Sequence, residues 1–318
     1  MDILLTGSVA YDYLMTFPGL FKEQILPERL EKISLSFLVD SMSRQRGGIA
    51  PNIAYTIALL GERPRIMATV GEDFGEYRTW LEGHGIDTTF MKVIPGIFTA
   101  SFFATTDQMN AQIASFYPGA MGYAAQQKLE EVRPRPDLVV VSPNDPVAMM
   151  NFAAESRTLG IPYLYDPSQQ VLRLSGEELA RDMEGAHFLF VNDYEFELIS
   201  KKTGLDLQHM LEHIAVLVVT RGADGSSIYT DGREYNIPVV PPERILDPTG
   251  VGDAYRGGFL TGYAHGWEWE LCGQMGALAA SYCLEQKGPQ NHAYARKEFV
   301  ARFRKHFDDR SKLDELPG

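Results

Sequence analysis

The stretch Asp247-Pro-Thr-Gly-Val-Gly-Asp253, continued by Ala-Tyr-Arg-Gly-Gly-Phe259, joins a glycine-rich turn to the start of a helix. Gly250 and Gly252 let backbone amides point inward, and a helix N-terminus adds unpaired N–H groups and a positive dipole end. We therefore expect the amides of Gly250, Val251 and Gly252 to bind a phosphoryl group. Asp253 is placed to accept the proton of a hydroxyl that attacks this group. The alternative is a plain loop with Asp253 as the helix N-cap.

Short apolar β-type runs alternate with helical patterns on either side of this stretch. The pattern predicts an α/β fold, with a largely parallel central sheet and helices on both faces. In such a sheet the carboxyl ends of the strands form the binding crevice. The predicted strands are 3–6, 65–70, 138–141, 163–165, 188–191 and 216–220, and the predicted helices are 52–60, 74–83, 146–159, 194–203, 253–265 and 270–284.

Two segments break the strand–helix rhythm. Residues 11–46 and 97–118 contain alternating polar and apolar positions, and Asp107-Gln-Met-Asn110 is typical of a hairpin turn. We interpret them as a small β lid, which leaves 1–10, 47–96 and 119–310 as the α/β core. The tail from Lys312 to Gly318 is expected to fray.

Composition excludes several classes of function. The 318 residues carry a formal net charge of −13, which argues against sequence-independent binding to nucleic acid or to anionic membranes. Cys272 and Cys283 are the only cysteines, too few for a disulfide framework. The N-terminal residues lack the pattern of a signal peptide, and no apolar run reaches the length of a membrane span. We expect a soluble, cytoplasmic protein.

The motifs together resemble those of the PfkB-type (ribokinase-like) carbohydrate and nucleoside kinases. Asp247–Phe259 is similar to the C-terminal signature of that family, Gly47-Gly-Ile-Ala-Pro-Asn52 to its N-terminal glycine motif, and Asn192-Asp-Tyr-Glu195 to its central Asn-x-x-Glu. The resemblance is closest to prokaryotic nucleoside (adenosine) kinases. It implies a ribokinase-like fold, ATP and Mg²⁺, and phosphotransfer to the primary hydroxyl of a nucleoside such as adenosine. A sugar kinase of the ribokinase or fructokinase type is the alternative, and a nucleoside-binding protein without turnover is the second.

The resemblance also implies an acceptor site near the first strand. Asp12 corresponds to a sugar-binding carboxylate, although a solvated or capping role would need no ligand. Gly47 and Gly48 allow backbone to approach a ligand or to act as a hinge, with a plain turn as the alternative. Asn52 corresponds to a ribose contact and could instead be the N-cap of the helix that follows.

The nucleotide side of the site is implied in the same way. Asn192 and Glu195 correspond to residues linked to Mg²⁺ through water, and Thr220, Gly222 and Gly225 to a nucleotide-binding loop, for which a strand-turn-strand hairpin is the alternative. Asp247 and Thr249 are candidate ligands of a monovalent cation such as K⁺. Arg256 could contact a phosphate or pair with a surface carboxylate.

Other signals are weaker. His209 and His213 match an inverted zinc-protease pattern, but they fit the polar face of a helix better. No P-loop motif is present, nor a dinucleotide-binding glycine motif after the first strand. The lid aromatics could stack on a base or form hairpin core, and the lid offers a surface for a homodimer. These aromatics are Phe102, Phe103, Phe116 and Tyr117.

Overall fold

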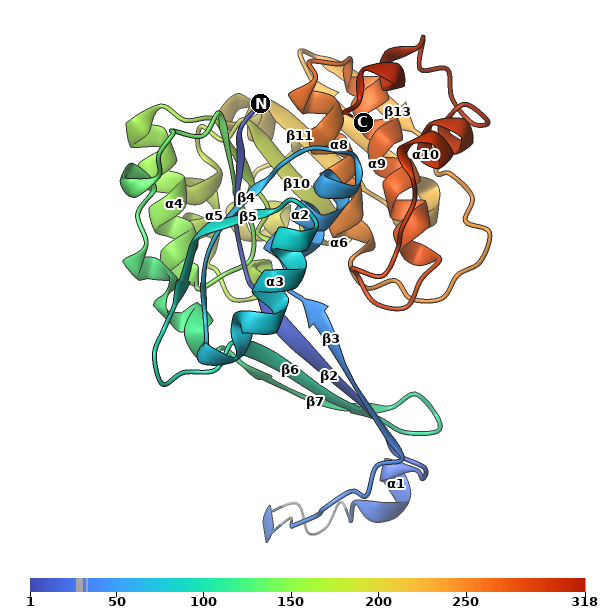
Figure 1. Ribbon diagram of the computed structural model, residues 1–318. Coiled ribbons are helices and arrows are strands. Elements are labelled where there is room, and N and C mark those ends of the chain that lie inside the picture. Colours follow the sequence, from blue (N-terminus) through green and yellow to red (C-terminus); the bar gives the residue numbers. More distant parts are fainter. Residues whose placement is uncertain (27–30, 33, 318) are drawn as a thin grey trace.

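A nine-stranded sheet forms the centre of the computed structural model, which describes residues 1–26, 31–32 and 34–317 (Figure 1). Strand pairs from β11 to β5 are all parallel, and β12 and β13 extend one edge as an antiparallel hairpin. The order is β13-β12-β11-β10-β9-β8-β1-β4-β5. The bounds are β1 (Ile3–Thr6), β4 (Arg65–Val70), β5 (Asp87–Val93), β8 (Leu138–Val141), β9 (Tyr163–Tyr165), β10 (Phe188–Asn192), β11 (Val216–Thr220), β12 (Ser226–Thr230) and β13 (Arg233–Ile237).

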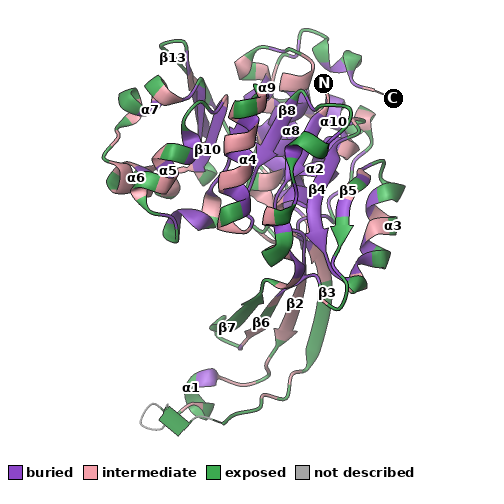
Figure 2. Cartoon of the chain, turned by 90° about the vertical axis from the view of Figure 1, so that its left-hand side faces the viewer, coloured by how far each residue is buried: buried purple, intermediate pink, exposed green. Residues whose placement is uncertain are grey.

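Successive strand residues point to opposite faces and form two separate cores. Leu5 and Val140 belong to one core, whereas their neighbours Leu4 and Val139 belong to the other. Helices therefore cover both faces, as the sequence predicted, and the buried strands lie between them (Figure 2). The first core includes residues of α2 (Ile49–Leu59), α3 (Gly75–Gly83), α8 (Val251–Ala264), α9 (Trp269–Leu284) and α10 (Arg296–Phe303), and the second those of α4 (Pro146–Leu159), α5 (Gly176–Met183), α6 (Asp193–Thr203) and α7 (Leu207–His213).

A second sheet of the described chain projects from the main body (Figures 1 and 2). It has four strands in the order β3-β2-β6-β7, where β2 is Ala10–Thr16, β3 is Ser41–Gly47, β6 is Ala100–Thr106 and β7 is Gln112–Tyr117. The short helix α1 (Phe21–Gln24) lies at its far end. The predicted hairpin turn is confirmed, because the Asp107 carboxylate accepts hydrogen bonds from the amides of Met109 and Ala111. This sheet occupies the segments that we interpreted as the lid.

Two helices begin earlier than predicted, because a glycine with positive φ forms the N-cap of each. Gly48 (φ +97°) precedes α2, so that Asn52 lies inside the first turns of the helix. Gly250 (φ +77°) precedes α8, so that Asp253 is its third residue. The capping alternatives for Asn52 and Asp253 are therefore wrong.

Several elements escaped the sequence analysis, namely β5, β13, α5 and α10, and β12 was considered only as part of the hairpin alternative. The expectation that the tail frays is also wrong for its described residues. Lys312–Glu315 forms a 3-10 helix, Leu313 and Leu316 are buried, and the Trp267 indole donates to Glu315 at 3.3 Å. These apolar anchors hold the tail on the core, while Gly318 lies outside the described residues. None of the described helices has the length and apolarity needed to cross a membrane.

Candidate active site

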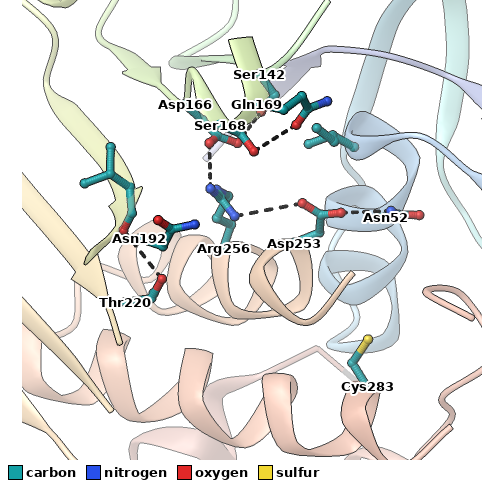
Figure 3. A network of polar contacts seen from close by, with 12 residues as sticks. Asn52, Ser142, Asp166, Ser168, Gln169, Asn192, Thr220, Asp253, Arg256 and Cys283 are labelled. Carbon is teal, nitrogen blue, oxygen red and sulfur yellow. Dashed lines mark hydrogen bonds and ion pairs between the residues drawn. The ribbon is translucent and has the colours of Figure 1, made fainter. Parts of the chain in front are cut away.

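Polar side chains from several strand ends meet the N-terminus of α8 (Figure 3). Ser142 follows β8, Asp166 follows β9, and Asn192 and Thr220 end β10 and β11. The parallel arrangement brings these strand ends to one edge of the sheet, where α/β proteins bind their ligands. The topology therefore brings these side chains close to the N-terminus of α8, where the motif Asp247–Asp253 ends.

The start of α8 is suited to an anion. None of the described side chains caps it, and the amides of Gly252 and Asp253 lie in a first turn that offers them no helical carbonyl. The Val251 amide lies 3.3 Å from Pro248 O, a weak contact. A Cβ on Gly250 would lie 2.3 Å from Pro289 Cβ, so only glycine fits this turn. Together with the helix dipole, this geometry favours a phosphoryl group.

Asp253 is held by a chain of buried amides. Asn52 Nδ2 donates to Asp253 Oδ2 at 2.8 Å, and Gln290 Nε2 donates to both Asn52 Oδ1 and Tyr77 Oη at 2.6 Å. Burial raises the pKa of Asp253 to about 6, against the lowering effects of Arg256 and Asn52. A carboxylate whose pKa is close to the working pH is suited to general-base catalysis. The sequence analysis gave no role to Tyr77 and did not connect Gln290 with Asn52.

Arg256 pairs with a buried carboxylate rather than with the surface carboxylate that we had considered. Its Nη2 lies 2.5 Å from Asp166 Oδ1, and Ser142 Oγ donates to Asp166 Oδ2 at 3.1 Å. Its Nη1 lies 3.9 Å from Asp253 Oδ1. Arg256 thus connects the end of β9 with the predicted base.

Asp12 on β2 lies against the backbone of Gly47. A Cβ on Gly47 would lie 2.6 Å from Asp12 Oδ2, and one on Gly48 would lie 2.5 Å from Ser8 O. Both glycines therefore permit close approaches that a plain turn would not require. Burial raises the pKa of Asp12 to about 6, and the charge of Asp247 adds to this effect.

Asn192 and Glu195 form a capping box at the start of α6. Asn192 Oδ1 accepts from the Glu195 amide at 2.7 Å, and Glu195 Oε2 accepts from the Asn192 amide at 2.8 Å. Burial raises the pKa of Asp166 to about 7, and the charges of Glu195 and Asp253 contribute. Such a group of carboxylates is compatible with a cation. The described residues contain no group of three His, Cys, Asp or Glu side chains that could hold a metal ion directly.

The loop after β11 connects an antiparallel pair, which confirms the hairpin alternative without excluding a ligand. Thr220 Oγ1 donates to Val191 O at 3.5 Å. Gly225 (φ +84°) approaches Ile237 O so closely that a Cβ would lie 2.2 Å from it, whereas Gly222 (φ +53°) faces open space. The contact with Ile237 requires glycine at position 225 for packing alone, whereas none of the described residues would contact a Cβ added to Gly222.

Asp247 joins two loops behind the anion site. Its carboxylate accepts from the amide of Thr249 at 2.9 Å and from that of Gly288 at 2.9 Å.

The histidines of α7 face separate acidic partners. His209 Nδ1 lies 2.8 Å from Asp206 Oδ1, and His213 Nδ1 lies 2.6 Å from Glu184 Oε2. These contacts support the interpretation that His209 and His213 lie on the polar face of a helix.

A glycine-rich helix start with a buried carboxylate beside it, at the carboxyl edge of an α/β sheet, is an arrangement suited to a phosphotransferase. Comparison with known families is more specific. Residues 6–296 match the model described as "pfkB family carbohydrate kinase", and the chain belongs to this family. It is therefore a kinase with a ribokinase-like fold, and the family implies ATP as phosphate donor together with a divalent metal ion.

Similar proteins cover almost the whole chain. The nucleoside kinase of Methanocaldococcus jannaschii is 31% identical over 96% of this chain and 97% of its own length. That of Methanothermobacter thermautotrophicus is also 31% identical, over 95% of each chain. The solved structure of Burkholderia thailandensis nucleoside kinase in complex with inosine is 37% identical, covers 96% of this chain and 98% of its own, and superposes with a TM-score of 0.86.

Proposed function

We propose that this kinase transfers the γ-phosphoryl group of ATP to the primary, 5′-type hydroxyl of a nucleoside such as adenosine or inosine. The acceptor oxygen forms a bond to phosphorus while the bond from phosphorus to the ADP oxygen breaks. Asp253 accepts the proton of the hydroxyl, and the leaving ADP takes the electron pair of the broken bond. The amides at the start of α8 stabilise the charge on the transferring group.

The registry of the lid sheet carries the assignment to a nucleoside. Asp12, Phe102 and Phe116 are direct partners on three neighbouring strands, and direct partners lie on the same face of a sheet. Phe103 belongs to the opposite face, where its ring stacks on Tyr13 at 4.8 Å between centroids. A nucleoside whose ribose binds Asp12 would thus place its base toward Phe102 and Phe116. Phe116 is 50% exposed and available for stacking.

The similar proteins support the same acceptor. The two relatives from Methanocaldococcus jannaschii and Methanothermobacter thermautotrophicus are named nucleoside kinases. The Burkholderia thailandensis enzyme was also solved in complex with ADP-inosine. A sugar kinase remains the second candidate, because ribokinase structures share the fold. A binding protein without turnover would not require a buried carboxylate beside an anion site, since ionised Asp253 destabilises the fold.

We assign the remaining ligands by their position near the carboxyl ends of the strands and the start of α8. Thr220 ends β11, Gly222 and Gly225 lie in the loop between β11 and β12, and all three are proposed to contact ATP. Asn192 and Glu195 would hold Mg²⁺ through water, and the ion would neutralise phosphate charge. Asp247 and Thr249 are proposed to contact a monovalent cation such as K⁺, with the loop that Asp247 ties to Gly288 forming the rest of its site.

Identification of the product tests the proposal. Phosphorus NMR of a reaction with ATP, Mg²⁺ and inosine should show inosine 5′-monophosphate, and 5′-deoxyinosine should yield no nucleotide. A product phosphorylated elsewhere on the ribose would refute the assignment of the primary hydroxyl. So would consumption of ATP at the same rate with 5′-deoxyinosine as with inosine.

The lid could also join two copies of the chain, and we propose a homodimer of this kind. Every residue of the edge strand β7 is exposed, including Ile113 and Tyr117. An open strand edge is a template for pairing with another strand. Light scattering after size-exclusion chromatography should give twice the chain mass, and Ile113→Lys should reduce it to one. A monomeric wild-type protein would contradict the dimer.

A further inference from the structure

We propose that Arg256 is a further catalytic residue, whose guanidinium contacts the transferring phosphoryl group while Asp166 holds it in place. The proposal rests on phosphotransfer from ATP and does not depend on which acceptor is used. A sugar preference would therefore refute the nucleoside assignment and leave this inference intact.

The hydrogen-bonding capacity of Arg256 is largely unused within the described chain. A guanidinium carries five N–H donors on three nitrogens. Nη2 binds Asp166, whereas Nη1 is 3.9 Å from Asp253, beyond hydrogen-bonding distance. Nε is buried and has no hydrogen-bond partner among the described residues. Since the side chain is only 10% exposed, water does not readily compensate these donors.

The position of the guanidinium directs this capacity to the anion site. A Cβ on Gly252 would lie 2.9 Å from Arg256 Nη1, so the guanidinium packs against the first turn of α8. The absence of a side chain at Gly252 makes room for it. Arg256 and the amides of this turn therefore border the same space, where a phosphoryl group would accept hydrogen bonds from both.

The surroundings keep Arg256 charged and oriented. Burial opposes its charge, but Asp166, Asp253 and Glu195 outweigh that effect, and its pKa lies above the ordinary value. Asp166 is fully buried and is itself held by Ser142. In other phosphotransfer enzymes an arginine at the transferring group accelerates the reaction about 10³–10⁵-fold. Arg256 takes no part in bond making or proton transfer and acts only on charge.

A purely structural ion pair is the competing explanation, and a double variant separates the two. Arg256→Met leaves Asp166 buried without its partner, so loss of activity could reflect damage to the fold. Arg256→Met combined with Asp166→Asn removes both charges and this penalty. Turnover, melting temperature and affinity for ADP should be measured for wild type, both single variants and the double variant with the same acceptor.

If Arg256 acts on the phosphoryl group, Arg256→Met lowers kcat about 10³-fold or more. The double variant regains the melting temperature but not the turnover, and ADP affinity stays within about threefold. Aluminium fluoride bound with ADP imitates the transferring group, and the affinity for this complex falls about 10²-fold or more. Recovery of kcat in the double variant to within tenfold of wild type would overturn the proposal. So would an Arg256→Met variant that keeps more than a tenth of its turnover.

Discussion

Asp253 shows how a single side chain is prepared for its proposed role. It sits in the first turn of α8, accepts a hydrogen bond from Asn52 and faces Arg256 at 3.9 Å. These partners favour the ionised form, whereas burial favours the neutral form and prevails. The result is a carboxylate that is ionised at neutral pH but more basic than one in water.

Replacement of Asp253 by Asn keeps the shape of the side chain and removes the base. We expect kcat to fall by about 10²–10⁴, the usual contribution of a positioned proton acceptor, with little change in ATP affinity. Steady-state kinetics with saturating ATP and Mg²⁺ measure this effect. A folded Asp253→Asn protein that retains more than about a tenth of the turnover would show that Asp253 is not the base.

The same substitution should make the protein more stable at neutral pH. The pKa of Asp253 is raised from 3.8 to about 6 on folding, so the folded state binds the proton more tightly than the unfolded state. The ionised carboxylate therefore destabilises the fold above pH 6, and this cost disappears as the pH falls toward 4. We expect Asp253→Asn to gain on the order of 1–3 kcal/mol at pH 7.5, or about 2–4 °C in melting temperature.

Thermal unfolding at two pH values checks this sign. The difference in melting temperature between Asp253→Asn and wild type should shrink as the pH falls below 6 and largely vanish below pH 3.8, where the wild-type carboxyl group is mostly protonated in both states. A variant that is less stable than wild type at pH 7.5 would mean that the ionised carboxylate contributes to stability.

At the scale of elements, the two faces of the lid sheet have different functions in this account. Phe116 shares the face of Asp12, and Phe103 lies on the opposite face against Tyr13. The hairpin thus carries the same residue type on both sides. One ring is assigned to the nucleoside and the other to the packing of the lid.

Phe116→Ala should lower kcat/KM for nucleosides about tenfold or more, since stacking on a base contributes roughly 1–3 kcal/mol. The value for free ribose should change little. Phe103→Ala is the matched control, because it removes an aromatic ring from the opposite face of the hairpin. The assignment of this face would be refuted if the two variants lowered kcat/KM for nucleosides equally. It would also be refuted if Phe116→Ala lowered kcat/KM for ribose as much as for nucleosides.

Close packing between helices brings Asn52 to Asp253. At Gly257 on α8, an added Cβ would lie 2.6 Å from Thr56 Cβ and 3.0 Å from Ile53 O, both on α2. A larger residue there would push α2 and α8 apart. The hydrogen bond between Asn52 and Asp253 spans these two helices and depends on their separation.

Gly257→Ala should therefore destabilise the protein by about 1–3 kcal/mol and also reduce turnover. Gly83→Ala provides the control, because Gly83 lies in α3 with open space around its Cα. Alanine there should be neutral or stabilising by up to about 1 kcal/mol. Urea denaturation measures both changes, and an unchanged Gly257→Ala protein would show that the helices can separate freely.

At the scale of the whole molecule, sequence patterns predicted what depends on local chemistry. The buried strand 138–141 and the helix 146–159 have the predicted bounds, because a continuous apolar run and an Asp145-Pro146 helix start are local signals. The sequence also predicted a helix that starts after the glycine-rich turn, and Asp253 lies in the first turn of that helix, α8. Glycine N-caps at positive φ were missed, and they shifted the starts of α2 and α8.

Features that depend on distant packing could not be predicted. The contact of Gln290 with Asn52 and Tyr77 joins segments more than 200 residues apart. The partner of Arg256 is 90 residues away in the sequence. The burial of Leu313 and Leu316 depends on the surface that the core offers to the tail. Such contacts become visible only after the sheet has brought its strand ends together.

The choice of acceptor tests the central claim most directly. We propose to measure kcat/KM with ATP and Mg²⁺ for adenosine, inosine, guanosine, cytidine, ribose and fructose under identical conditions. The account predicts that at least one nucleoside exceeds both free sugars by about tenfold or more, because only a nucleoside uses the aromatic face of the lid. A higher kcat/KM for ribose or fructose than for every nucleoside would contradict it.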